Sequence, residues 1–130
     1  MTGTVEIEVA AGELIDKITI LQIKYRHIGD AAKAANVRRE LESLENTRER
    51  HLPASEALTA LTSDLLAVNE QLWEIEDDIR DCERRQDFGE AFVALARAVY
   101  VTNDRRAALK REISTLMGSR FMEEKAYQPY

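Results

Sequence analysis

The chain has 130 residues, of which 45 % are hydrophobic and 32 % are charged, which is the size and mix of a single domain. Five glycines and two prolines are too few for a fold rich in tight turns, so the composition predicts a mostly helical protein. A net charge of −6 argues against nucleic acid as a partner, because phosphate binding depends on a surplus of Lys and Arg.

The sequence indicates a cytoplasmic protein. The N-terminus lacks the basic and apolar regions of a signal peptide, and no apolar run is long enough to cross a membrane. Cys82 has no second cysteine to pair with, and its position in a helical apolar repeat predicts a buried, unreactive thiol. We therefore expect no export, no membrane contact and no structural disulfide.

The first part of the chain predicts an extended arm followed by two short helices. Alternating apolar residues indicate the arm over about residues 4–10. A helix over about residues 12–28 is indicated by an apolar stripe at helical spacing, consisting of Leu14, Ile18, Leu21, Tyr25 and Ile28, and it ends at Gly29. A thinner stripe predicts a second helix over about residues 33–51, which stops before Pro53.

The rest of the chain predicts a long antiparallel hairpin over about residues 55–86 and 88–117. Apolar positions from Leu58 to Cys82 alternate spacings of three and four, which predicts one long helix capped by Ser55. Asp87 and Glu90 have the spacing of a capping box for the next helix, which would place Phe88 and Gly89 in its first turn, and Gly118 supplies its left-handed end. Residues that face each other across so short a connection should have numbers summing to about 174.

The predicted fold class is therefore all-α. We expect a single domain over residues 1–130, an elongated helical bundle built on the long hairpin with the two shorter helices packed on it. The tail over residues 119–130 should be irregular. Because the tail contains two apolar residues and two tyrosines, it should either pack back on the helices or present an aromatic peptide to a partner.

The hairpin register predicts a polar layer halfway along the two long helices. Asn69 should approach Asn103, and Trp73 should approach Tyr100. Such a layer can fix the register of a bundle, or it can form a pocket whose amide and guanidinium donors suit a small carboxylate or phosphate. The candidate ligand-binding residues are Asn69, Trp73, Arg80, Tyr100, Asn103 and Arg106.

Acidic residues on the third helix are weak candidates for a metal site. Carboxylates within two helical turns could share a Mg²⁺ ion, and these are Glu74, Asp77, Asp78 and Asp81, with Glu13 and Asp16 forming a further pair on the first helix. No second acidic repeat mirrors the first, as metal sites in four-helix bundles usually require, so we expect no metal and no cofactor. Zinc sites, serine triads and Gly-rich phosphate loops are not recognisable in the sequence.

Four blocks resemble an uncharacterised bacterial family of small helical proteins that is classed only as a domain of unknown function. The blocks are GELIDKITIL at 12–21, LWEIEDDIR at 72–80 after Asn69, NDRRA at 103–107 after Tyr100, and EEK at 123–125 followed by Tyr127. The resemblance spans about residues 5–130. It implies an independent helical protein and brings no activity, cofactor or catalytic residue.

The leading functional hypothesis is a non-enzymatic interaction or scaffold module that acts as a homodimer. Two long helices half covered by two short ones would leave an apolar groove exposed, and a second copy or another protein could cover it. One alternative is a binding protein or enzyme for a small carboxylate or phosphate metabolite, by architectural analogy with the helical chorismate mutases. The other alternative is a Mg²⁺-dependent nucleotide hydrolase built on the acidic turns.

Overall fold

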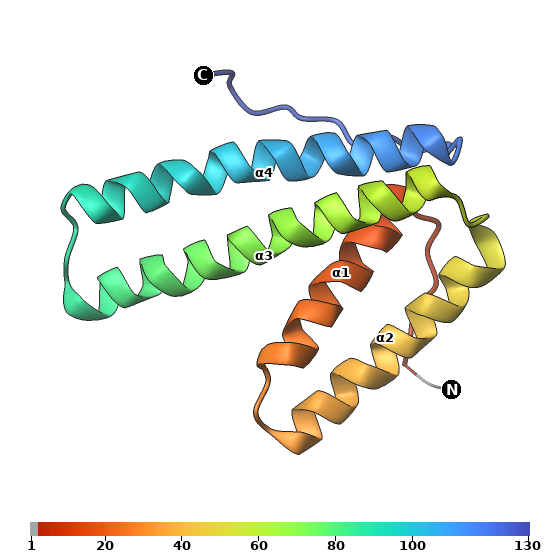
Figure 1. Cartoon of the computed structure of the whole chain (residues 1–130), viewed down its shortest axis with the longest axis horizontal. Coiled ribbons are helices and arrows are strands. Elements are labelled where there is room, and N and C mark those ends of the chain that lie inside the picture. The colour runs from red at the N-terminus through yellow and green to blue at the C-terminus, as the bar shows by residue number, and fades with distance from the viewer. Residues whose placement is uncertain (1–2) are drawn as a thin grey trace.

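A computed structural model describes residues 3–130 and contains four α-helices: α1 Ala11–His27, α2 Ala31–His51, α3 Glu56–Arg85 and α4 Glu90–Leu116. The helices α3 and α4 form a long antiparallel hairpin, and α1 and α2 form a shorter hairpin that lies obliquely across one end of it (Figure 1). The described residues include no strand, so the prediction of an all-α bundle is confirmed.

Polar side chains cap α2 and α3, whereas α1 and α4 have no side-chain cap, and the starts of α2 and α4 differ from the predicted ones. Ser55 accepts the Leu58 N–H at 3.0 Å and caps α3 as expected. Asp30 caps α2, so that helix starts at Ala31, two residues before the predicted position. Asp87 does not cap α4: its carboxylate accepts the Gly89 N–H at 3.1 Å in an Asx turn, and α4 begins only at Glu90.

The helix α1 is the central element because it packs against all three other helices, whereas the backbone of α2 runs beside α1 alone. This differs from the prediction that both short helices cover the groove of the long hairpin. The predicted α1 stripe is also incomplete. Ile15, Asp16, Thr19 and Ile23 are buried although they lie outside that stripe, and Tyr25 within it is 42 % exposed. A helix held between a second helix and a hairpin must bury two faces.

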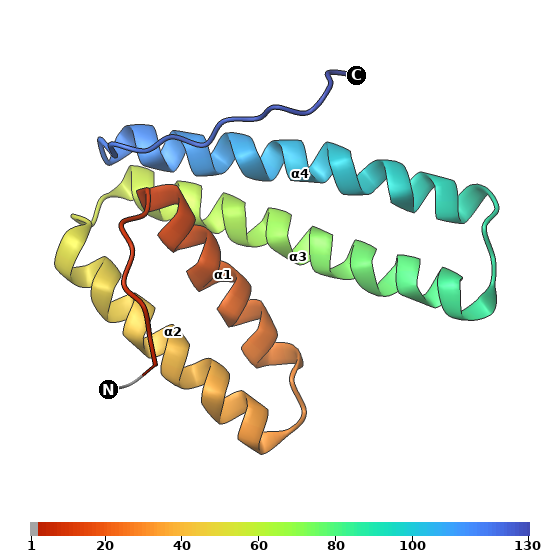
Figure 2. The same cartoon turned by 180° about the vertical axis from the view of Figure 1, so that it is seen from behind.

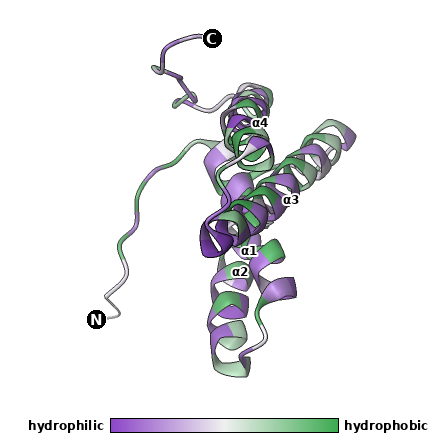
Figure 3. Cartoon of the chain, turned by 90° about the vertical axis from the view of Figure 1, so that its left-hand side faces the viewer, coloured by the Kyte–Doolittle hydropathy of each residue, from purple (hydrophilic) through white to green (hydrophobic). Residues whose placement is uncertain are grey.

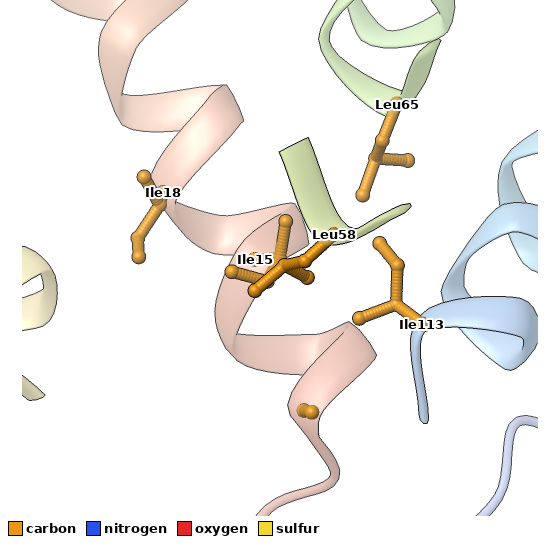
Figure 4. Packing of buried hydrophobic residues seen from close by; sticks show 6 residues of the cluster. Ile15, Ile18, Leu58, Leu65 and Ile113 are labelled. Atoms are coloured by element: carbon orange, nitrogen blue, oxygen red, sulfur yellow. The ribbon is translucent and has the colours of Figure 1, made fainter. Parts of the chain in front are cut away.

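The core lies where α1, α3 and α4 meet. In Figure 4 its buried members Ile15, Leu58, Leu65 and Ile113 converge, while Ile18, also buried, lies further along α1 and points away from them. Gly12 in the first turn of α1 allows this approach, since a Cβ atom there would lie 2.1 Å from the backbone oxygen of Lys110. Its N–H donates to the Ser114 hydroxyl at 3.0 Å, so the start of α1 rests directly on α4.

The long hairpin extends well past α1, as Figures 1 and 2 show from opposite sides. We call Gln71–Arg85 of α3 together with Glu90–Val101 of α4 the distal half. Cys82, which is 2 % exposed, is the one residue of the distal half that is buried. The predicted burial of this thiol is thus confirmed, but the apolar seam around it is covered by no third helix among residues 3–130.

The arm and the tail flank the helices on different sides. Residues 3–10 are extended and stand away from the bundle in Figure 3, where their hydropathy alternates along the chain. The tail runs back along α4, held by ion pairs from Arg111 to Glu124 at 2.7 Å and from Lys125 to Asp104 at 3.1 Å (Figure 2). Arg120 at the start of the tail pairs with Glu8 of the arm at 2.8 Å.

Candidate functional site

A buried polar cluster ties α1, α3 and α4 together at one point, and we call Asp16, Thr19, Asn69 and Arg106 the three-helix junction. Arg106 of α4 binds Asp16 of α1 through two hydrogen bonds, from Nε to Oδ1 at 2.9 Å and from Nη2 to Oδ2 at 2.6 Å. Asn69 of α3 donates from Nδ2 to Asp16 Oδ1 and to Thr19 Oγ1, both at 2.9 Å. The Thr19 hydroxyl completes the cluster by donating to the Asp16 backbone oxygen at 2.7 Å.

Burial makes this pairing obligatory. Asp16 is 3 % exposed, while the Arg106 side chain is 30 % exposed and therefore reaches solvent at its edge. The hydrogen bonds to Asp16 raise the pKa of Arg106 above its ordinary value, although burial opposes this. The guanidinium stays charged, and the carboxylate compensates that charge inside the molecule.

A hollow of about 520 Å³ opens beside the junction, in the corner where the long hairpin leaves α1, and we call it the corner hollow. Apolar walls come from α1 and α3, and polar groups come from α3 and α4. Its lining is Ile20, Ile23, Asn69, Leu72, Trp73, Glu76, Asp77, Arg80, Asn103 and Arg106. Five of the six predicted ligand-binding residues therefore lie around one cavity: Asn69, Trp73, Arg80, Asn103 and Arg106.

The aromatic residues of the predicted layer have other partners than expected. Trp73 stacks on His27 of α1, with ring centroids 4.9 Å apart, instead of approaching Tyr100. Tyr100 packs edge-on against Tyr130 of the tail at 5.2 Å and lies outside the corner hollow. The prediction failed here because it considered only the hairpin, whereas α1 and the tail supply the nearest rings.

A second hollow, of about 900 Å³, lies between α4 and the tail, and its cations are paired with carboxylates. Lys110 contacts Glu13 at 2.9 Å and Glu123 at 3.2 Å. Burial lowers the pKa of Lys110, but the hydrogen bonds with these two carboxylates outweigh it and raise the pKa above its ordinary value. Hydrogen bonds from Tyr130 and Lys125 lower the pKa of Asp104.

The acidic metal candidates face different neighbours. Within residues 3–130 no three His, Cys, Asp or Glu side chains are grouped so that they could hold a metal ion. Asp77 lines the corner hollow, Glu74 lines a small hollow beside Arg26, and Asp81 pairs with Arg84 and Arg85. Glu13 and Asp16 are likewise occupied, since they bind Lys110 and Arg106. Asp78, the fourth candidate on α3, is exposed.

Two features were missed at the sequence level. Asp16 was considered only as a metal ligand, although an arginine placed in an apolar seam requires a buried carboxylate nearby. The prediction follows a single apolar stripe through the segment Ala91–Val101 of α4. In fact Arg97 is the only charged residue of this segment, so apolar residues lie on all sides of the helix. Counting charges around the helix, instead of following one face, would have identified this segment.

No helix of the described chain has both the length and the apolar character that a membrane span requires.

Comparison with known proteins identifies a family whose function is unknown. Residues 5–130 match the model described as "Family of unknown function (DUF6165)". A search of curated proteins found no match, and a search of solved structures found none either. Because the match covers nearly the whole chain, from the arm to the last residue of the tail, the protein belongs to the DUF6165 family of unknown function.

Proposed function

We propose that the protein is a non-enzymatic helical interaction module that pairs with a second copy through the distal half of its long hairpin. The observation that carries the proposal is the segment Ala91–Val101 of α4. Arg97 is its only charged residue, yet none of its residues is buried. A helix that is apolar on all sides is typical of a protein interior. We therefore infer that another protein surface covers this segment.

The exposed area supports a large interface. The chain exposes 9245 Å². A compact monomer of 14.8 kDa would expose roughly 7000 Å². The uncovered hairpin, the extended arm and the tail all contribute to this excess of roughly 2000 Å², which is more than the roughly 800 Å² that each partner buries in a standard interface.

The charges of the distal half favour a second copy as the partner. On α3, Glu74 and Asp78 have no cationic partner in the described chain, and on α4 Arg97 has no carboxylate partner. Two distal halves related by a two-fold axis can place the acidic helix of each copy against the basic residue of the other. The four distal segments would then form a four-helix bundle around the exposed apolar seam.

The three-helix junction fits a structural role in this module. Its hydrogen bonds connect α1, α3 and α4, and no fully buried side-chain nitrogen or oxygen in the described residues lacks a partner. The small-anion alternative receives less support, because Asp16 already compensates the Arg106 charge. The magnesium alternative also receives less support, because the acidic residues face separate neighbours.

Sedimentation equilibrium at tens of micromolar tests the proposal. We expect twice the monomer mass of 14.8 kDa for the wild type. The double variant Val93→Glu, Val101→Glu places charges on two exposed sides of the distal α4 segment, so it should be monomeric while keeping its helical circular dichroism.

Ile7→Glu is the matched control, because Ile7 is an apolar arm residue that is 76 % exposed. This variant should remain dimeric. A monomeric wild type, or a double variant that dimerises as well as the wild type, would show that the proposal is wrong.

A further inference from the structure

The inner end of the corner hollow contains hydrogen-bonding groups that the protein itself does not use. Asn69 is only 5 % exposed. Its Nδ2 donates hydrogen bonds to Asp16 and Thr19, but its Oδ1 accepts none. This oxygen is open to the hollow, because every fully buried side-chain oxygen or nitrogen in the described residues has a partner. The inner end therefore offers a nearly buried acceptor to a donor group.

The uncompensated charge of the corner hollow is negative. Arg106 is paired with Asp16, and Arg80 is paired with Glu76 at 3.4 Å. Asp77 also lines the hollow, and it has no cationic partner among residues 3–130. A small anion would have to compete with carboxylates for both arginines, whereas an ammonium group would find a carboxylate available.

An apolar surface separates these two groups. Leu72 and Trp73 lie between Asn69 and Asp77 on α3, and Ile20 and Ile23 contribute from α1. The helical rise of ~1.5 Å per residue separates Asn69 from Asp77 by about 12 Å along the axis. The cavity of about 520 Å³ has the size of a small-molecule site.

We propose that the corner hollow binds an organic amine with an apolar, preferably aromatic, body. Its ammonium group would pair with Asp77, its body would pack against Trp73, and an uncharged donor at its other end would bind Asn69 Oδ1. The hollow borders the proposed dimer interface, because its α3 residues from Leu72 to Arg80 belong to the distal half. The residues that α4 contributes to the hollow, Asn103 and Arg106, lie beyond the distal half.

Trp73 is the only tryptophan of the chain, so its fluorescence reports on this hollow selectively. Three probes can be compared: tyramine, phenethylamine and 3-phenylpropionate, with excitation where phenols do not absorb. Tyramine should produce a saturable change in Trp73 emission, because it has both the ammonium group and a hydroxyl donor. Phenethylamine lacks the hydroxyl and should bind more weakly, and 3-phenylpropionate, which has a carboxylate, should bind least.

The matched pair Asp77→Asn and Asp78→Asn tests the assigned carboxylate. Both residues are exposed neighbours on α3, so neither change should affect folding. Only Asp77 lines the corner hollow. We expect Asp77→Asn to weaken tyramine binding roughly tenfold and Asp78→Asn to leave it unchanged.

Three results would overturn the assignment: no saturable response to either amine, binding of 3-phenylpropionate as tight as that of tyramine, or equal effects of the two Asn variants. The titration is repeated with the monomeric Val93→Glu, Val101→Glu variant. We expect this variant to bind tyramine as tightly as the wild type does. That result would support the amine site even if the dimer proposal were wrong.

Discussion

The two halves of the long hairpin share one sequence pattern but differ in their surroundings. In the half that α1 covers, Leu65 is fully buried and Val68 is 1 % exposed. In the distal half the pattern continues through Leu72, Ile75 and Ile79, which are only half-buried. The comparison shows that apolar periodicity identifies the face of a helix that needs covering, while the number of neighbours that cover it depends on elements elsewhere in the chain.

The most direct way to test this contrast is to truncate one leucine in each half. Leu65→Ala should cost about 3 kcal/mol of the free energy of unfolding, because it creates a cavity in a closed core. Leu95→Ala, in the half-buried distal seam, should cost about 1 kcal/mol in dilute solution. Urea denaturation of both variants measures the difference.

The same experiment at high protein concentration sharpens the comparison. If a second copy covers the distal half, the cost of Leu95→Ala should grow with concentration, whereas that of Leu65→Ala should increase much less. Equal costs for the two variants in dilute solution would mean that the two halves do not differ in packing.

The close approach of α1 to α4 predicts a strong effect of one added methyl group. Gly12→Ala should destabilise the protein by about 3 kcal/mol, because the new Cβ would overlap the Lys110 backbone oxygen and the helices would have to separate. Gly29→Ala is the control, since a Cβ there meets no atom within 4 Å, and it should change stability by less than about 0.5 kcal/mol. Thermal denaturation of both variants is sufficient, and a stable Gly12→Ala protein would contradict the packing.

Breaking the junction should have the next largest effect. Asp16→Asn leaves the Arg106 guanidinium without its carboxylate and should cost about 2 kcal/mol, less than for a fully buried pair because Arg106 reaches solvent. Glu40→Gln breaks the exposed pair between α2 and Lys17 of α1 and should cost below about 0.5 kcal/mol. Urea unfolding distinguishes the two, and similar costs would mean that the junction is not important for stability.

The smallest expected effect concerns pH. The folded protein raises the pKa of Lys110 above 10.5, so the stability that this group contributes is present below that pH and is lost as the pH rises through the folded value. Lys110→Met removes the titrating group, so the free energy of unfolding of this variant should decline less steeply in this alkaline range than that of the wild type. Unfolding free energies on both sides of this range give the slopes, and parallel slopes would contradict the predicted linkage.

The sequence predicted the long hairpin well because its signals are local. Ser55 and Gly118 mark helix ends through their own backbone and side-chain chemistry, and the register follows from a short turn. The hydrogen bond from Arg105 to Gln71 at 3.2 Å lies within two positions of the predicted pairing. The polar layer also lies at the predicted height, with Asn69, Asn103 and Arg106 around one hollow.

The position of α1 was beyond prediction because it depends on contacts between distant residues. Nothing near Asp16 in the sequence indicates that its partner is Arg106, and nothing near Gly12 indicates the α4 backbone. The tail presents the same problem, since its ion pairs with α4 determine where Tyr130 meets Tyr100.

The hydrogen bond from the Gly12 N–H to Ser114 joins residues 102 positions apart, and this has a consequence for synthesis. Helix α1 leaves the ribosome first, while the surface that receives it is complete only after α4 has been translated. Until then Ile15 and Asp16 can be covered by α2 and α3 at most, so the core of the nascent chain stays incomplete through most of its elongation. Docking of the first helix is therefore expected to be the last and slowest step of folding.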